Sequence, residues 1–307
     1  MRLAAISLAI LLAASACTAP RVPRAPTLQL HLNQVAEWTL HEYAARGLQA
    51  DGLALAAVWL RPDGTTEWAH VRGDAPVYPA SLVKLFYLVA VHGFLDAGRL
   101  TDSTELERAI TDMIVDSAND PTNYLLEVLT GASGGAELAE PELAAWMAQR
   151  QAVNEYFRAL GYTHVNACQK TWAEGPYGRE HQGYGANGGL RNSASANAIA
   201  RLWVEQIIQA RGPRADARRA LLSRDFTAAT TDPDDQRTGF TGKALPRGAK
   251  LWSKAGWTSK VRHDAAYVEL PTGEKVVWVI LTQGVASDRA LIPTVSRRFF
   301  AWFRQAR

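Results

Sequence analysis

The segment Ser81-Leu82-Val83-Lys84 places a hydroxyl and an amine three residues apart at the predicted start of a helix. Helical residues at positions i and i+3 share a face, so the Lys84 amine can reach the Ser81 hydroxyl. A serine is a weak nucleophile until a base takes its proton, and a lysine acts as that base when burial lowers its pKa. The apolar residues around Lys84 favour such burial. The pair therefore indicates nucleophilic serine chemistry, although Ser-x-x-Lys alone also occurs at ordinary helix starts.

Two later segments carry further polar groups. Ser117-Ala118-Asn119 ends a predicted helix, and Lys254-Ala255-Gly256 lies on a predicted strand. Taken one at a time, Ser117 fits an ordinary helix end, Asn119 a helix cap and Lys254 a solvated lysine on a strand. Together and in this order, the three segments resemble the Ser-x-x-Lys, Ser-x-Asn and Lys-Thr-Gly motifs of the serine β-lactamase and penicillin-binding protein superfamily. The flanking stretches Tyr78 to Leu85, Met113 to Leu126 and Arg262 to Gly284 resemble the corresponding stretches of class A β-lactamases. The resemblance as a whole covers most of Gly52 to Phe303.

The resemblance implies a role for each matching residue. Ser81 would attack an amide carbonyl and become acylated, with Lys84 accepting its proton. Ser117 would pass a proton to the leaving nitrogen. Asn119 would hold either Lys84 or the substrate amide. Lys254 would make Ser117 more acidic and attract a substrate carboxylate.

The strand residues around Lys254 imply contacts with substrate. Gly256 would let the substrate backbone lie close to the strand, because it has no Cβ. The N–H groups of Ser81 and Trp257 are candidates for an oxyanion hole. The hydroxyl usual in the third motif is missing at Ala255. Contacts to a substrate carboxylate must then come from Thr258, Ser259 or Arg262.

Deacylation is where the sequence departs most from class A β-lactamases. Their Glu-x-x-Leu-Asn pattern, which supplies a glutamate that activates water, is absent. The long aperiodic stretch 161–191 contains Glu174, the nearest candidate by position, which is equally well explained as a surface glutamate. We expect Cys168, in the same stretch, to be a small buried residue rather than a reactive thiol.

The pattern of apolar residues predicts the elements that position these groups. Strands are expected at 53–60 and 66–71 near the start, and at 249–254, 263–270 and 276–282 near the end. Between them lie predicted helices at 81–95, 105–129 with a break near 119–121, 144–160, 195–208 and 216–222, and further helices lie at 33–50 and 290–304. We therefore expect a β-lactamase-like α+β fold, in which N- and C-terminal strands form an antiparallel sheet packed with a mostly helical inserted region.

The N-terminus reads as an export signal. Residues 1–16 combine a short basic start with an apolar stretch, as secretory signal peptides do. Ala14-Ser15-Ala16-Cys17 resembles the bacterial lipobox, which implies lipidation at Cys17; the alternative is an ordinary signal peptide with an incidental cysteine. Residues 17–27 form a proline-rich tether. The catalytic domain is expected at 28–307, with a sheet part at 28–75 and 245–307 and a helical part at 76–244.

Composition narrows the function classes. The 33 basic and 30 acidic residues are dispersed along the chain, which argues against a nucleic-acid partner. Two cysteines, and seven histidines without a His-Glu-x-x-His pair, give no metal site, and no cofactor is expected. The segment 232–235 is interpreted as a solvated turn rather than a metal loop. The glycine-rich stretches 131–135 and 183–188 match a nucleophile elbow and a dinucleotide motif, but neither follows a predicted strand.

These observations favour an exported serine hydrolase, a β-lactamase that acts through an acyl-enzyme. The first alternative is a D-alanyl-D-alanine carboxypeptidase or transpeptidase of the penicillin-binding type. The second is a non-catalytic envelope lipoprotein that binds peptidoglycan. We expect a monomer on the periplasmic side of the bacterial envelope, anchored through the lipid at Cys17, with a β-lactam or a peptidoglycan stem peptide as its ligand.

Overall fold

Strand β1 (Leu53–Leu60) is apolar almost throughout, as a strand is when helices cover both faces of its sheet. The computed structural model, which describes residues 27–171 and 175–305, shows this arrangement. Ala54, Ala56 and Val58 face one hydrophobic cluster, which we call the first core. The alternate residues Leu55 and Ala57 face another, the second core, on the opposite side of the sheet.

The sheet has six antiparallel strands in the order β2-β1-β8-β7-β6-β5. It joins the N-terminal hairpin to the C-terminal strands, so the predicted α+β fold is confirmed. Strand β6 continues past its predicted end at residue 254, because Trp257 still pairs with Arg262 of β7. The other strands are β2 (Thr66–Val71), β5 (Ser223–Arg224), β6 (Lys250–Trp257), β7 (Val261–Glu269) and β8 (Lys275–Gln283).

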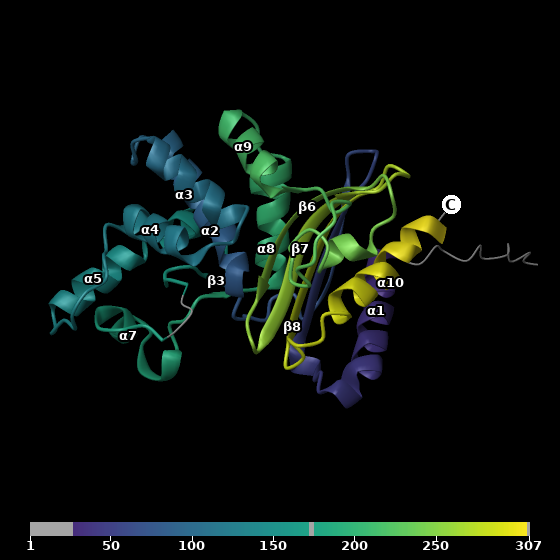
Figure 1. Ribbon diagram of the computed structural model, residues 1–307, viewed down its shortest axis with the longest axis horizontal. Coiled ribbons are helices and arrows are strands. Elements are labelled where there is room, and N and C mark those ends of the chain that lie inside the picture. Colours follow the sequence, from purple (N-terminus) through teal and green to yellow (C-terminus); the bar gives the residue numbers. More distant parts are fainter. Residues whose placement is uncertain (1–26, 172–174, 306–307) are drawn as a thin grey trace, which may run out of the picture.

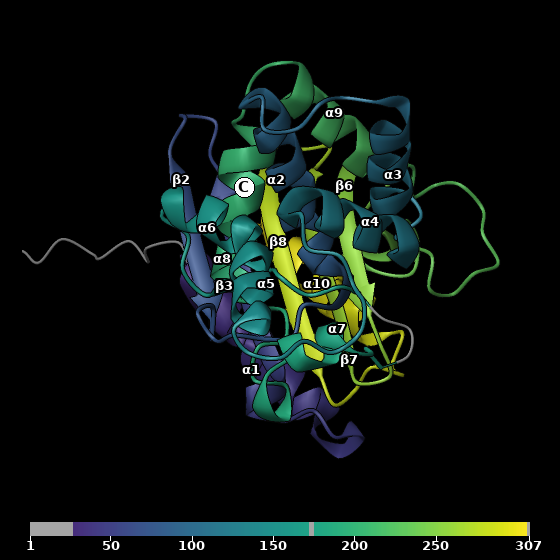
Figure 2. The same cartoon turned by 90° about the vertical axis from the view of Figure 1, so that its left-hand side faces the viewer.

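Helices cover the sheet on both faces (Figure 1). Helices α1 (Leu28–Tyr43) and α10 (Leu291–Gln305) pack on the side of the second core. The helical region covers the other face, in front of the strands in Figure 2. Helix α2 (Val83–Asp96) is buried almost all round, which makes it the centre of the first core.

The helical region differs from the sequence prediction in detail. The predicted helix over 144–160 is two helices, α5 (Glu142–Arg150) and α6 (Ala152–Ala159). The break expected at 119–121 lies just before Asn119, and Pro121 sits in the first turn of α4, where a missing N–H costs no hydrogen bond. The remaining elements are α3 (Thr104–Ile114), α4 (Asn119–Thr130), α7 (Arg179–Gly183), α8 (Ala196–Leu202), α9 (Pro213–Leu222), a π-helical segment (Trp203–Ile208), β3 (Val165–Asn166) and β4 (Ser193–Ala194).

Two predicted features lie outside the described residues. The signal peptide and Cys17 fall within residues 1–26, and Glu174 falls within 172–174. Within the described part of the chain, no helix is both long and apolar enough to cross a bilayer.

Candidate active site

Ser81 lies in a short 3-10 turn, η3 (Ala80–Leu82), that leads directly into α2. The preceding residue, Ala80, has φ 47°, a left-handed conformation that non-glycine residues adopt at a cost. The Ser81 side chain is half-buried, and its hydroxyl makes no hydrogen bond with any described residue. The turn therefore presents a hydroxyl that is free to react at the start of a rigid helix.

Gly256 brings strand β6 against the backbone of the nucleophile. A Cβ at this position would lie 2.8 Å from the Ser81 nitrogen and 3.0 Å from the Leu82 nitrogen. The absence of a side chain thus admits the protein's own turn, whereas we expected it to admit substrate backbone. Trp257 follows directly, so the two N–H groups predicted for the oxyanion hole belong to segments that pack on each other.

Lys84 reaches across to the second motif. Its buried amine donates to the Ser117 carbonyl, to Ser117 Oγ at 3.3 Å and to Asn119 Oδ1 at 2.9 Å. Of the two roles considered for Asn119, the structure shows the contact with Lys84. Burial lowers the pKa of Lys84 to about 7, so the neutral form is accessible near physiological pH. A neutral amine can donate only two of these three hydrogen bonds and keeps a lone pair that can accept a proton.

Lys254 approaches the same hydroxyl from the sheet. Its fully buried amine donates to Ser117 Oγ at 2.8 Å and to the Ala255 carbonyl at 2.9 Å. Burial, with Lys84 and Arg224 nearby, lowers the pKa of Lys254 well below its usual value. Ser117 itself has φ 57°, so a strained backbone holds the hydroxyl between the two amines.

Gln236 was not among the predicted site residues. Its Oε1 accepts from the Lys254 amine and from the Ala255 N–H at 3.3 Å, while its Nε2 donates to the Val115 carbonyl at 3.1 Å. It thus ties the strand that carries Lys254 to the segment that carries Ser117. No local sequence pattern marks it, because its partners are 18 to 121 residues away.

The segment 232–235 forms a turn, as predicted, and Asp232 is exposed, but Asp234 and Asp235 are half-buried and paired rather than fully solvated. Asp234 accepts from Arg262 at 2.8 Å and from Arg289 at 2.7 Å, and Asp235 pairs with Arg237. The partners of Asp234 are distant in sequence, so local composition could not show them, whereas Asp235 is held by an arginine two residues away. Among the described residues, no cluster of side chains suited to a metal ion is present.

Of the residues predicted to bind substrate, Thr258 and Arg262 are engaged elsewhere. Thr258 Oγ1 accepts from the Lys260 and Val261 N–H groups and so shapes the turn between β6 and β7. Arg262 is 2% exposed and paired with Asp234. In the described part of the chain, neither side chain hydrogen-bonds to Ser81 or Ser117.

The stretch before Glu174 lies along helix α4. Asn123, one turn beyond Asn119, donates to the Thr171 carbonyl at 3.1 Å and accepts from the Thr171 N–H at 2.9 Å. Cys168 is buried, as expected. Nearby carboxylates serve ion pairs: Glu180 contacts Arg150 and Lys170, and Glu127 contacts Lys170.

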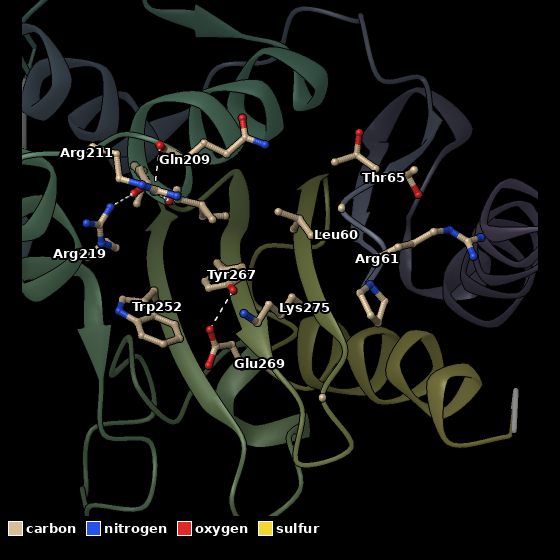
Figure 3. A pocket seen from close by; sticks show the side chains of 16 residues that line it. Leu60, Arg61, Thr65, Gln209, Arg211, Arg219, Trp252, Tyr267, Glu269 and Lys275 are labelled. Atoms are coloured by element: carbon tan, nitrogen blue, oxygen red, sulfur yellow. Dashed lines mark hydrogen bonds between the residues drawn. The ribbon is translucent and has the colours of Figure 1, made fainter.

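Two hollows help to locate the site. One, of about 520 Å³, is lined by Asp116, Gln236 and Trp257 among others, so it adjoins Ser117 and Lys254. Another, of about 590 Å³, lies by the turns after β1 and β7 and the segment 207–211, and Trp252 and Tyr267 are among its lining residues (Figure 3). Of the predicted site residues that the structure describes, none lines the second hollow, and Trp257 alone lines the first.

Comparison with known proteins agrees with this geometry. The sequence profile of the β-lactamase enzyme family matches residues 46–303, most of the chain. The chain belongs to the β-lactamase enzyme family. No curated protein sequence matches it.

Solved structures with the same fold include β-lactamases and PBP-A. A β-lactamase from Sphaerobacter thermophilus is 19% identical with a TM-score of 0.59, covering 86% of this chain and 95% of that one. A class A β-lactamase from Mycobacterium abscessus is 16% identical with a TM-score of 0.63, covering 88% and 99%. A variant of PBP-A, solved as an acyl-enzyme with penicillin G, is 20% identical with a TM-score of 0.60, covering 89% and 97%. At these identities the likeness establishes the fold.

Proposed function

We propose that this protein is a serine hydrolase that opens β-lactam rings through an acyl-enzyme on Ser81. The observation that carries the proposal is the meeting of Lys84 and Lys254 at Ser117 Oγ, on segments that are far apart in sequence. Gly256, in the third motif, packs directly against the backbone of Ser81. All three motifs thus converge around one hydroxyl.

The three motifs suggest how acylation would proceed, with the Lys84 amine turning to Ser81 from its partners on Ser117 and Asn119. Ser81 Oγ attacks the lactam carbonyl while neutral Lys84 takes its proton, and the Ser81 and Trp257 N–H groups stabilise the oxyanion. The C–N bond then breaks, and Ser117 gives its proton to the leaving nitrogen. Lys84, which already donates to Ser117, returns the proton that it took. Atoms and charge balance, and the product is an ester on Ser81.

A penicillin-binding peptidase is a second candidate, favoured by the lack of a carboxylate beside Lys84 and Lys254 among the described contacts of the site. Among the described residues, no carboxylate contacts Ser81, Lys84, Ser117 or Asn119. Glu127 and Glu180 are held in ion pairs. If Glu174 also fails to activate water, the ester would persist, as it does in an enzyme that penicillin inhibits.

Turnover of a chromogenic cephalosporin separates the candidates. We expect sustained turnover in the wild type, none in Ser81→Ala, and a single burst in Glu174→Gln. A burst that stalls in the wild type would favour the peptidase. No burst and no covalent label on Ser81 in folded protein would favour the non-catalytic binding protein and refute both enzymes.

We also propose that the protein is exported and anchored in the bacterial envelope through Cys17. The support is the lipobox-like sequence that precedes this cysteine. Cys17→Ala should prevent lipidation and release the protein from the membrane fraction. Unchanged processing and fractionation would contradict lipidation while leaving the catalytic proposal intact.

A further inference from the structure

The segment 78–82, which carries Ser81 and which we call the nucleophile turn, rests on two neighbouring residues of the sheet. Gly256 of β6 pairs with His263 of β7, and the side chains of such a pair lie on the same face of a sheet. The space left by the missing Cβ of Gly256 is taken by backbone of the nucleophile turn. The His263 ring therefore lies beside this contact, under the same turn.

Both nitrogens of the buried His263 ring are hydrogen-bonded. Nδ1 lies 3.0 Å from the Thr282 nitrogen, and because a backbone N–H can only donate, the ring proton must be on Nε2. Nε2 then donates to the Tyr78 carbonyl at 2.9 Å. Burial lowers the pKa of His263 to about 4, so the ring keeps this neutral form at physiological pH. The ring thus connects strand β8 to the start of the nucleophile turn.

The conformation of the nucleophile turn requires such support. Ala80 has φ 47°, and a strained backbone persists only where the surrounding structure holds it. The Tyr78 carbonyl lies three residues before Ser81, at the place where a turn usually accepts an N–H. Here this carbonyl accepts from His263, and the Ser81 N–H donates to no backbone carbonyl in the part of the chain that the structure describes. The N–H assigned to the oxyanion hole is therefore free.

We propose that His263 is a positioning residue for acylation, because its bond to the Tyr78 carbonyl keeps the Ser81 N–H available to the oxyanion. The inference rests on the proposed acyl-enzyme function. Without the ring proton the Tyr78 carbonyl would lose its partner, and the Ser81 N–H is the donor that a turn offers to it. A hydrogen bond between these two groups would withdraw the donor from the oxyanion, whereas substrate would still bind.

Two substitutions separate the two hydrogen bonds of His263. The amide nitrogen of glutamine can take the place of Nε2, so His263→Gln keeps the bond to Tyr78 and loses the bond to Thr282. The amide oxygen of asparagine can take the place of Nδ1, so His263→Asn keeps the bond to Thr282 and loses the bond to Tyr78. Each variant loses one buried hydrogen bond, so urea unfolding should show similar losses of stability.

Intact-protein mass spectrometry follows the acylation of Ser81 by benzylpenicillin in the purified full-length protein, over a range of penicillin concentrations. We expect His263→Asn to lower the limiting acylation rate roughly tenfold to a hundredfold, with a half-saturating concentration within about twofold of the wild type. His263→Gln should acylate within about threefold of the wild-type rate, because the Ser81 N–H stays free. A merely structural role would slow both variants alike.

A measurement on the wild type keeps the inference testable if a variant does not fold. With isotope-labelled histidine, NMR at about pH 7 should show the His263 ring protonated on Nε2 alone, with a through-space contact from this proton to Tyr78. A proton on Nδ1, or on both nitrogens, would contradict the bond to Tyr78 and overturn the inference.

The outcomes separate this inference from the function on which it rests. Labelling of wild-type Ser81, with a slow asparagine variant and a near-normal glutamine variant, supports both. If the wild type is labelled and the two variants slow equally or not at all, the role of His263 is wrong and the acyl-enzyme stands. If penicillin does not label Ser81 in the wild type, the proposed function fails and the role of His263 fails with it.

Discussion

Replacing Lys84 by methionine should remove the contribution of this amine to the pH dependence of the free energy of unfolding between about pH 7 and 10.5. The amine is buried, and its pKa is lowered from 10.5 to about 7. A change of this size corresponds to about 5 kcal/mol of unfavourable free energy for the charged form in the folded state. Methionine fills a similar volume and cannot be protonated, so it removes this cost.

The sign follows from proton binding. Between about pH 7 and 10.5 the unfolded chain keeps the Lys84 proton while the folded protein has released it. The unfolded state therefore binds more protons, and the stability of the wild type rises with pH across this window. Relative to Lys84→Met, the wild type should gain about 2 kcal/mol between pH 7 and pH 9. Below pH 7 the difference between the two proteins should level off.

Urea unfolding of both proteins at several pH values measures this difference. Lys84→Met loses its hydrogen bonds to Ser117 and Asn119, which costs about 1–3 kcal/mol at every pH and leaves the slope unchanged. Lys243→Met, at an exposed lysine, is the control: its free energy of unfolding should change with pH in the same way as that of the wild type.

The acylation rate of the wild type should rise through about pH 7 as Lys84 becomes neutral, and the methionine variant should lose acylation. Stability curves that stay parallel from pH 6 to 9 would show that Lys84 keeps an ordinary pKa. The assignment of Lys84 as the neutral base would then be refuted.

Three further substitutions test other contacts. Gly256→Ala should slow Ser81 acylation at least about tenfold and cost about 1–3 kcal/mol in urea unfolding, because its Cβ would meet the turn backbone at 2.8 Å; an unchanged rate would contradict the close packing. Gln236→Glu should raise the pKa of Lys254 by placing a carboxylate against the amine, shifting the pH profile of acylation, whereas an unshifted profile would mean that Gln236 does not act on this lysine. Glu180→Gln should destabilise the fold by about 3–5 kcal/mol, because it leaves the buried Arg150 without its carboxylate; a loss under 1 kcal/mol in urea unfolding would argue against this ion pair.

The sequence determined the elements and the reactive pair. The run of apolar residues and the turn residues that bound it predicted β1 and β2 with their observed bounds, because apolar patterning and turn chemistry are local properties of the sequence. The Ser81 and Lys84 pair could be found for the same reason, since it sits within one helical turn. The apolar neighbours of Lys84 also indicated its burial, which is the cause of its lowered pKa.

Only the tertiary structure decided what surrounds this pair. Gln236 bonds to Val115, 121 residues earlier in the chain, and Asp234 forms an ion pair with Arg262, 28 residues later. Gly256 is required by the backbone of a turn that lies 175 residues before it in the sequence. Such contacts depend on how distant segments pack, which local spacing does not encode. The sequence therefore determined which groups could react, and tertiary packing determined which side chains surround them and which of their charges are paired.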